Sequence, residues 1–244
     1  MYLKSVTILR EQFPKKNRDY PFTIPSLAKI DTIEFPRNVT FFVGENGSGK
    51  STLLEAIAYQ CEFNTGSGGR NNYYHVDRGE AAFGDYIRLS WLPKMTQGFF
   101  LRAESFYQFA SHVDETARLA LRPYEAYGGK SLHEQSHGEA FLALFTHRFG
   151  KKGIYLLDEP EAALSPARQL SLLAVMRRLE REGGSQFIIA THSPILLGYP
   201  GAQILSFDSA PLREIAYEET DHYQITRRFL ENRQRFLTEL FDEV

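Results

Sequence analysis

The sequence has a single cysteine, no long apolar run and no large excess of charge of one sign. Cys61 alone cannot form an internal disulfide, which fits a reducing compartment. The first residues lack a signal-peptide core, and no stretch approaches the ~20 apolar residues of a membrane-spanning helix. The formal net charge of −2 gives the whole chain no basic character of a nucleic-acid binder, although a local basic patch is still possible. We therefore expect a cytoplasmic protein of ordinary globular composition.

A glycine-rich turn near the start of the chain carries the strongest motif. An apolar run at 39–43 predicts a strand and residues 53–58 predict the start of a helix; between them lie Gly44, Glu45, Asn46, Gly47, Ser48, Gly49, Lys50, Ser51 and Thr52. This is the G-x-x-x-x-G-K-[ST] pattern, in which backbone N–H groups and a helix N-terminus face phosphate oxygens. We expect this loop to bind a nucleotide, with Lys50 at the β- and γ-phosphates and Ser51 on Mg²⁺.

Two later apolar strands end in polar side chains. The run 154–158 ends in Asp158 and is followed by Glu159, and the run 187–191 is followed by His192. Because parallel strands present their C-terminal ends at one edge of a sheet, we expect all three side chains beside the phosphate loop. Asp158 would then hold Mg²⁺, Glu159 would take a proton from the attacking water, and His192 would contact the terminal phosphate. In isolation, the simpler interpretation of each would be a solvated acid or a structural histidine.

The remaining pattern is that of an α/β protein. Apolar strands alternate with helices from residue 154 onward, including an amphipathic helix at 166–182, which indicates a parallel sheet covered on both faces. Residues 105–150 have helical periodicity with breaks at 122–123 and 127–129. Residues 64–72, rich in glycine, serine and asparagine, predict a mobile surface loop, with a lid over nucleotide or partner as the alternative.

The end of the chain predicts one helix from Thr220 to about Phe241. Its apolar stripe indicates core packing in preference to a partner surface, and consists of Ile225, Phe229, Phe236, Leu237 and Leu240. Cys61 and five histidines show no metal-ligand spacing and are expected to be structural. These histidines are His75, His112, His133, His147 and His222.

The segment Ser136-His137-Gly138-Glu139 precedes another apolar helix. It fits a capping box, in which the serine and the glutamate satisfy backbone N–H groups at the helix start. The same serine hydroxyl and glycine N–H would also suit an anion. Since the segment lies in the helical region, away from Lys50, the anion would belong to the nucleotide of a second copy.

These motifs, in this order, resemble the ABC-type ATPases, and more narrowly the small stand-alone AAA-family ATPases related to RecF, SMC and Rad50 heads. The phosphate loop matches Walker A, 154–159 matches Walker B, and His192 matches the switch histidine. Residues 136–139 match the signature motif and 163–166 match the D-loop. The resemblance implies an ATP-sandwich homodimer, in which Ser136, Gly138 and Glu139 close on the partner's γ-phosphate.

The resemblance also implies one ABC-type ATPase domain over 1–244 with a P-loop NTPase fold. Its RecA-like core, a mostly parallel sheet plus antiparallel N-terminal strands, would comprise 1–104 and 151–217. A helical signature subdomain would occupy 105–150, and a C-terminal helix 218–244. Phe13 and Tyr20 are the candidates for stacking on adenine.

Two positions depart from the family pattern. The signature reads S-H-G-E after Gln135, where transporter subunits have L-S-G-G-Q, and Glu104 stands at the Q-loop position where the family has glutamine. A carboxylate at 104 can approach Mg²⁺, but its charge beside the γ-phosphate would slow turnover or change coupling. We therefore expect a Mg²⁺-dependent ATPase that moves an effector protein or nucleic acid, in nucleic-acid maintenance or defence. A transporter subunit with a membrane permease is the less favoured alternative, and a non-hydrolytic nucleotide sensor is another.

Overall fold

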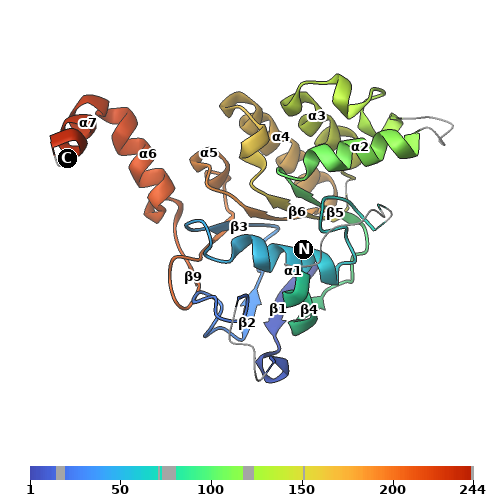
Figure 1. Ribbon diagram of the computed structural model, residues 1–244, viewed down its shortest axis with the longest axis horizontal. Helices are drawn as coiled ribbons and strands as arrows, with labels where there is room; N and C mark the ends of the chain where they lie inside the picture. Colours follow the sequence, from blue (N-terminus) through green and yellow to red (C-terminus); the bar gives the residue numbers. More distant parts are fainter. Residues whose placement is uncertain (15–19, 71, 73–80, 118–123, 151, 243–244) are drawn as a thin grey trace.

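The computed structural model describes residues 1–14, 20–70, 72, 81–117, 124–150 and 152–242. Within these residues the strands form two sheets (Figure 1). One is antiparallel, in the order β2-β1-β4. The other has the order β5-β6-β7-β3-β8-β9 and is parallel except for its last strand. The strands are β1 (Leu3–Ile8), β2 (Thr32–Glu34), β3 (Val39–Val43), β4 (Ile87–Trp91), β5 (Gly98–Arg102), β6 (Ile154–Asp158), β7 (Gln186–Ala190), β8 (Gln203–Ser206) and β9 (Arg213–Glu214).

The helices alternate with the parallel strands, as the sequence predicts. Short 3₁₀ turns and a π-helical turn at Leu144–Arg148 connect several of them. None of the described helices is long and apolar enough to cross a bilayer. The α-helices are α1 (Lys50–Gln60), α2 (Phe106–Ala117), α3 (His137–Ala143), α4 (Pro166–Gly183), α5 (Pro194–Leu197), α6 (Asp221–Glu231) and α7 (Arg233–Asp242).

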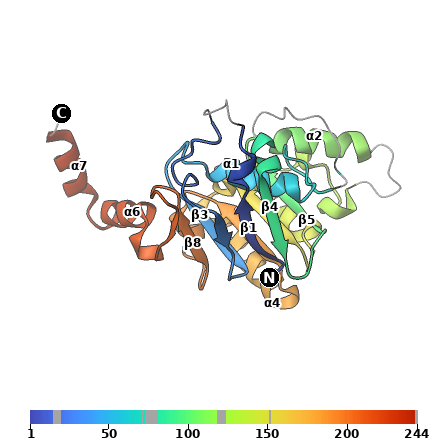
Figure 2. The ribbon, with the colours of Figure 1, turned by 90° about the horizontal axis from the view of Figure 1, so that it is seen from below.

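The larger sheet separates two apolar cores. Because successive residues of a strand face opposite sides, Phe41 and Leu157 pack into one core while their neighbours Phe42 and Leu156 pack into the other. The first core lies against α2, α3 and α4. The second contains α1 and the antiparallel sheet, so that α1 is buried between the two sheets (Figures 1 and 2).

The register of the larger sheet brings its strand ends together. Arg102 at the end of β5 is paired with Asp158 at the end of β6, and Asp158 is paired with Ala190 at the end of β7. Ala190 is also opposite Phe42, one residue before β3 ends. The phosphate loop and both polar strand ends therefore leave the sheet at the same edge, which confirms the expected fold class.

The glycine-rich segment beginning at residue 64 differs from the expected surface loop. Gly68 and Phe100 exchange backbone hydrogen bonds of 2.8 and 3.1 Å along the open side of β5. Ser67 is fully buried, and its hydroxyl accepts from the N–H of Arg102 at 3.0 Å. The segment is irregular as predicted, but its predicted surface position was wrong for residues 66–69, which are buried. An edge strand offers unpaired backbone groups that a nearby segment can satisfy. Residues 71 and 73–80, including His75, lie outside the described part of the chain.

The C-terminal segment also differs from its prediction. It forms two helices, α6 and α7, broken at Asn232, and both project from the body of the molecule (Figures 1 and 2). The side chains of Ile225 and Leu240 are 57% and 51% exposed. Phe229 and Phe236 contact each other edge to face, with ring centroids 5.8 Å apart. The prediction that this stripe packs into the core is therefore wrong.

Candidate active site

The phosphate loop connects β3 to α1 and has the backbone that its glycines allow. Gly49 caps α1 with φ +102°, and a side chain there would run into Ile24. The Lys50 ammonium donates to the carbonyls of Gly44 at 2.6 Å and Glu45 at 2.9 Å. Burial lowers the pKa of Lys50, and the nearby carboxylates oppose that change. Asp208, just after β8, accepts the N–H of Glu45 at 2.7 Å and so fixes the start of the loop.

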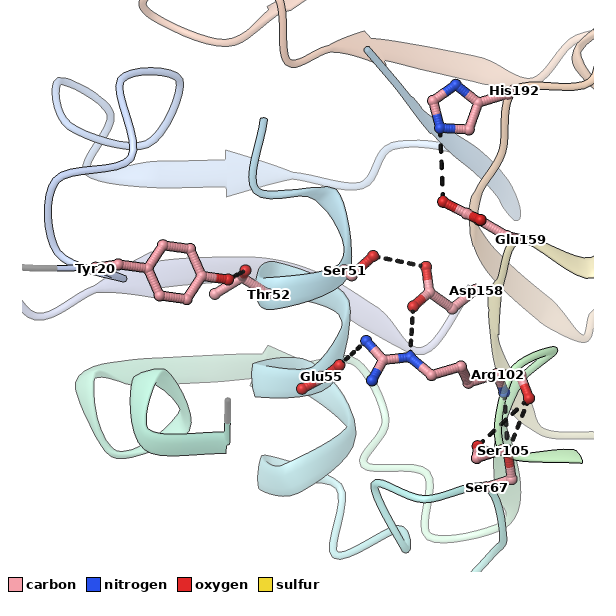
Figure 3. A network of polar contacts seen from close by, with 10 residues as sticks. All are labelled: Tyr20, Ser51, Thr52, Glu55, Ser67, Arg102, Ser105, Asp158, Glu159 and His192. Carbon is pink, nitrogen blue, oxygen red and sulfur yellow. Dashed lines mark hydrogen bonds and ion pairs between the residues drawn. The ribbon is translucent and has the colours of Figure 1, made fainter. Parts of the chain in front are cut away.

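A chain of polar contacts joins α1 to the ends of β5 and β6 (Figure 3). The Ser51 hydroxyl donates to Asp158 Oδ1 at 3.0 Å, and Arg102 Nε donates to Asp158 Oδ2 at 3.0 Å. The same guanidinium forms an ion pair with Glu55. Asp158 and Glu55 are both only 3% exposed. Burial raises the pKa of Asp158, whereas Arg102 and Ser51 hold it down.

Four residues predicted to surround Mg²⁺ and the reacting water line one small cavity. Ser51, Asp158, Glu159 and Glu104 border a space of about 70 Å³, together with Arg102. Hydroxyl and carboxylate oxygens are the donors that Mg²⁺ prefers. No group of three or more His, Cys, Asp or Glu side chains among the described residues forms a metal cage. Mg²⁺ in nucleotide sites is usually held by one or two carboxylates and the phosphates, so this donor set suits it.

Glu159 has a left-handed backbone, with φ +49° and ψ +51°. Consecutive side chains of an extended strand point to opposite faces, and this turn allows Asp158 and Glu159 to border the same cavity. A left-handed conformation is costly for a non-glycine residue, by about 1–2 kcal/mol, and such strain concentrates at functional sites. The expected turn at the end of this strand is present.

His192 follows β7 and lies against Glu159, with Nε2 3.6 Å from Oε1 (Figure 3). Its backbone N–H donates to Glu161 Oε1 at 2.6 Å. Its Nδ1 is 2.9 Å from Nε2 of His222, at the start of α6. Burial lowers the pKa of His192, and the charge of Lys50 lowers it further. His222, expected to be one of several structural histidines, is therefore in direct contact with the site.

The signature segment caps α3 on the side of the sheet opposite α1. The capping box is present: Glu139 Oε2 accepts from the Ser136 N–H at 3.0 Å and from its hydroxyl at 2.5 Å. Both side chains are at the surface. Arg168, two residues after the start of α4, donates to the Ser136 hydroxyl at 3.3 Å and lies against Gly138. The signature segment is therefore in contact with the first turn of α4, which directly follows the predicted D-loop at 163–166.

The two candidates for adenine stacking are placed differently. The Tyr20 hydroxyl contacts the Thr52 hydroxyl at the start of α1, and its side chain is exposed (Figure 3). Phe13 packs instead into an aromatic cluster, 4.8 Å from the ring of Phe22 and 5.8 Å from that of Tyr86. Tyr20 is thus next to the phosphate loop, whereas the ring of Phe13 is used in packing.

Sequence reasoning missed several residues of the site. Glu55 could have been found, because it is the one charge in the otherwise apolar start of a helix and a buried charge needs a partner. Arg102 closes an apolar strand and gives a weaker signal of the same kind. His222 and Asp208 gave no signal, since only the folded chain brings them to the loop.

Comparisons with known proteins agree with this arrangement. A family model described as "AAA domain" matches residues 25–110, and one described as "AAA domain, putative AbiEii toxin, Type IV TA system" matches 124–198. A "putative ABC transporter ATP-binding protein" of Bacillus thuringiensis is 29% identical over 72% of this chain and 34% of its own length. The chain thus spans about a third of the first curated relatives that it matches. The hemin import ATP-binding protein of Vibrio anguillarum is 26% identical over 68% of this chain and 69% of its own.

Solved structures agree at the level of the fold. A chain described as "an inward-facing conformation of a putative metal-chelate type ABC transporter" superposes with a TM-score of 0.50 and 14% identity, covering 93% of this chain and 88% of that one. The phosphate loop and the carboxylates at the end of β6 thus stand on a fold shared with ABC proteins. Both AAA-domain family models and the ATP-binding relatives support an ABC-type ATPase of the AAA-domain class.

Proposed function

We propose that this protein binds ATP with Mg²⁺ and hydrolyses it, working as an ATP-sandwich homodimer. The observation that carries the proposal is that the phosphate loop, Asp158, Glu159 and His192 meet at one sheet edge. Ser51, Asp158 and Glu159 line a small polar cavity there, and His192 lies against Glu159. A purely structural cluster of ion pairs would not need a glutamate with a strained backbone beside a histidine and a glycine-rich anion-binding loop.

The residues divide the chemistry among them. Lys50 would bind the β- and γ-phosphates in place of its loop carbonyls, and Ser51 and Asp158 would hold Mg²⁺, with Glu104 close enough to approach it. Mg²⁺ there would neutralise charge that develops on the phosphates. Glu159 accepts a proton from the attacking water, and His192 holds the γ-phosphate.

The nucleotide site would be completed by a second copy. Ser136 and Glu139 are exposed next to Arg168 of α4, with Gly138 buried between them, and this position would suit a meeting with the nucleotide of a partner. In this proposal the core comprises 1–104 and 151–217, the signature subdomain 105–150, and the C-terminal part 218–244. Tyr20 is the better placed residue for stacking on adenine.

The work driven by ATP is proposed to be movement of an effector protein or nucleic acid in maintenance or defence. The mention of an AbiEii toxin in one matching family model supports defence. The second candidate is a transporter subunit, because the curated relatives include import ATP-binding proteins. Co-purification of a membrane permease would favour transport, whereas a nuclease or toxin would favour defence.

The test is Glu159→Gln, which keeps the size of the side chain but cannot accept the proton. We expect this variant to bind ATP, to lose hydrolysis, and to accumulate as a dimer on a sizing column when ATP and Mg²⁺ are present. Glu231→Gln, an exposed carboxylate on α6, is the matched control and should behave as the wild type.

Lys50→Ala tests the phosphate loop separately. Loss of the ammonium should abolish tight ATP binding, measured by calorimetry, without preventing folding. Normal affinity in this variant would contradict the loop assignment, and unchanged turnover of Glu159→Gln would contradict the general-base role. A Glu159→Gln protein that binds ATP but stays monomeric would contradict the sandwich dimer.

A further inference from the structure

The contact between His192 and His222 affects which ring nitrogen of His192 carries its hydrogen. His192 Nδ1 and His222 Nε2 are 2.9 Å apart, so one of these two nitrogens carries the shared hydrogen. A neutral imidazole carries one ring hydrogen. Whether one ring nitrogen donates to a neighbour or accepts from it determines which of the two nitrogens bears that hydrogen. The state of His222 therefore sets what His192 can offer from its other nitrogen.

That other nitrogen points into the active site. His192 Nε2 is buried, has no hydrogen-bond partner, and lies 3.6 Å from Glu159 Oε1. A carboxylate in this position favours a hydrogen on Nε2, and so would the oxygens of a γ-phosphate. This requires Nδ1 of the neutral ring to accept, which in turn requires His222 Nε2–H to donate.

His222 is held firmly enough to perform this role. Thr220, the N-cap of α6, is 1% exposed, and its hydroxyl accepts from the Tyr223 N–H at 3.3 Å. Tyr217 packs against the ring of Tyr223 and donates its hydroxyl to the carbonyl of Pro194 at 2.9 Å. The first turn of α6 is thus fixed to the body, although the rest of α6 and α7 projects away.

We propose that His222 is a positioning residue, which donates to His192 Nδ1 and so keeps Nε2–H of His192 directed at Glu159 and the γ-phosphate. Hydrolysis thereby depends on the placement of the first turn of α6, which is outside the strand ends that carry the sequence motifs. The proposal rests on the proposed ATPase function and adds a residue that none of the sequence motifs contains.

The experiment compares five full-length variants, one of them His192→Ala, with the wild type in steady-state ATP hydrolysis. His222→Ala should lower kcat by about tenfold, a typical cost of losing the partner that orients a functional histidine, while KM changes less than about twofold. His222→Gln can donate from its amide and should recover most of kcat. Arg235→Ala, which removes an exposed ion pair on α7, is the control and should not change kcat.

The double variant, His192→Ala/His222→Ala, decides whether His222 acts through His192. If it does, the double variant is no slower than His192→Ala alone, because the effects of coupled residues are not additive. A further loss in the double variant, or full activity of His222→Ala, would overturn the inference. An inactive wild type would instead refute the proposed function itself.

Nitrogen-detected NMR of the histidine rings gives a readout that does not depend on turnover. In the wild type, His192 should carry its hydrogen on Nε2, and His222→Ala should redistribute it between the two nitrogens. A wild-type His192 protonated on Nδ1 would refute the proposal even if His222→Ala proved too unstable to assay.

Discussion

Replacing Arg102 with methionine tests the buried charge cluster beneath the cavity. The guanidinium lies between two carboxylates, Asp158 and Glu55, each 3% exposed. Methionine has a similar length and fills the space without charge. The substitution thus leaves two buried acids, of which Asp158 keeps only the hydrogen bond from Ser51.

The structure sets the size of the expected effect. Removing one partner of a buried ion pair costs about 3–5 kcal/mol, because the remaining charge is left without compensation. For a chain of this length, each kcal/mol corresponds to about 2–4 °C in Tm, so Arg102→Met should lower Tm by about 6–20 °C. An exposed pair such as Arg227–Glu231 contributes only about 0–1 kcal/mol, and Arg227→Ala is the control.

The measurement is unfolding followed by circular dichroism, by heat and by urea. In Arg102→Met/Glu55→Gln, one of the two uncompensated charges is gone, so the double variant should regain part of the lost stability. If Arg102→Met unfolds within 2 °C of the Arg227→Ala control, or if Glu55→Gln gives no recovery, the assignment of a buried charge cluster is wrong.

Four further outcomes are expected. Glu104→Gln removes negative charge beside the γ-phosphate and should raise kcat for ATP; a lower kcat would mean that the carboxylate is needed. Ser136→Arg should block hydrolysis while ATP binding to the monomer, measured by calorimetry, stays intact; preserved turnover would exclude a role for this segment across a dimer. Burial raises the pKa of Cys61 to about 12, so a thiol reagent at pH 8 should label it only in denaturant. Burial lowers the pKa of both His192 and His222, so below about pH 6.5 the unfolded chain binds more protons than the folded chain. The free energy of unfolding should therefore fall as the pH drops below that value, and it should fall less steeply in His222→Gln.

The active-site edge could be predicted because it depends on a general property of parallel sheets. Gly44–Ser51, Asp158 and His192 each follow an apolar strand, and parallel strands end at a common edge. The turn that allows Asp158 and Glu159 to border one cavity was expected for the same reason. None of this required knowledge of which strand lies beside which.

The contacts that could not be predicted depend on packing between distant segments. Arg102, at the end of β5, meets Glu55 only because α1 packs against the larger sheet. His222 meets His192 only because α6 begins near the end of β7. Composition also misled at two places. The composition of residues 66–69 predicts flexibility, but Gly68 pairs with the open edge of β5. The apolar stripe of the C-terminal helices predicts burial, but a stripe alone does not show which surface, if any, covers it.

The left-handed backbone of Glu159 has a consequence for engineering this protein. Glycine adopts such a conformation at little cost, so Glu159→Gly would relieve local strain while removing the carboxylate. A screen that rewarded heat resistance alone would therefore enrich changes at this position and return more stable molecules that lack the proposed general base. Directed evolution of this scaffold would have to keep residue 159 constant or select for turnover in every round.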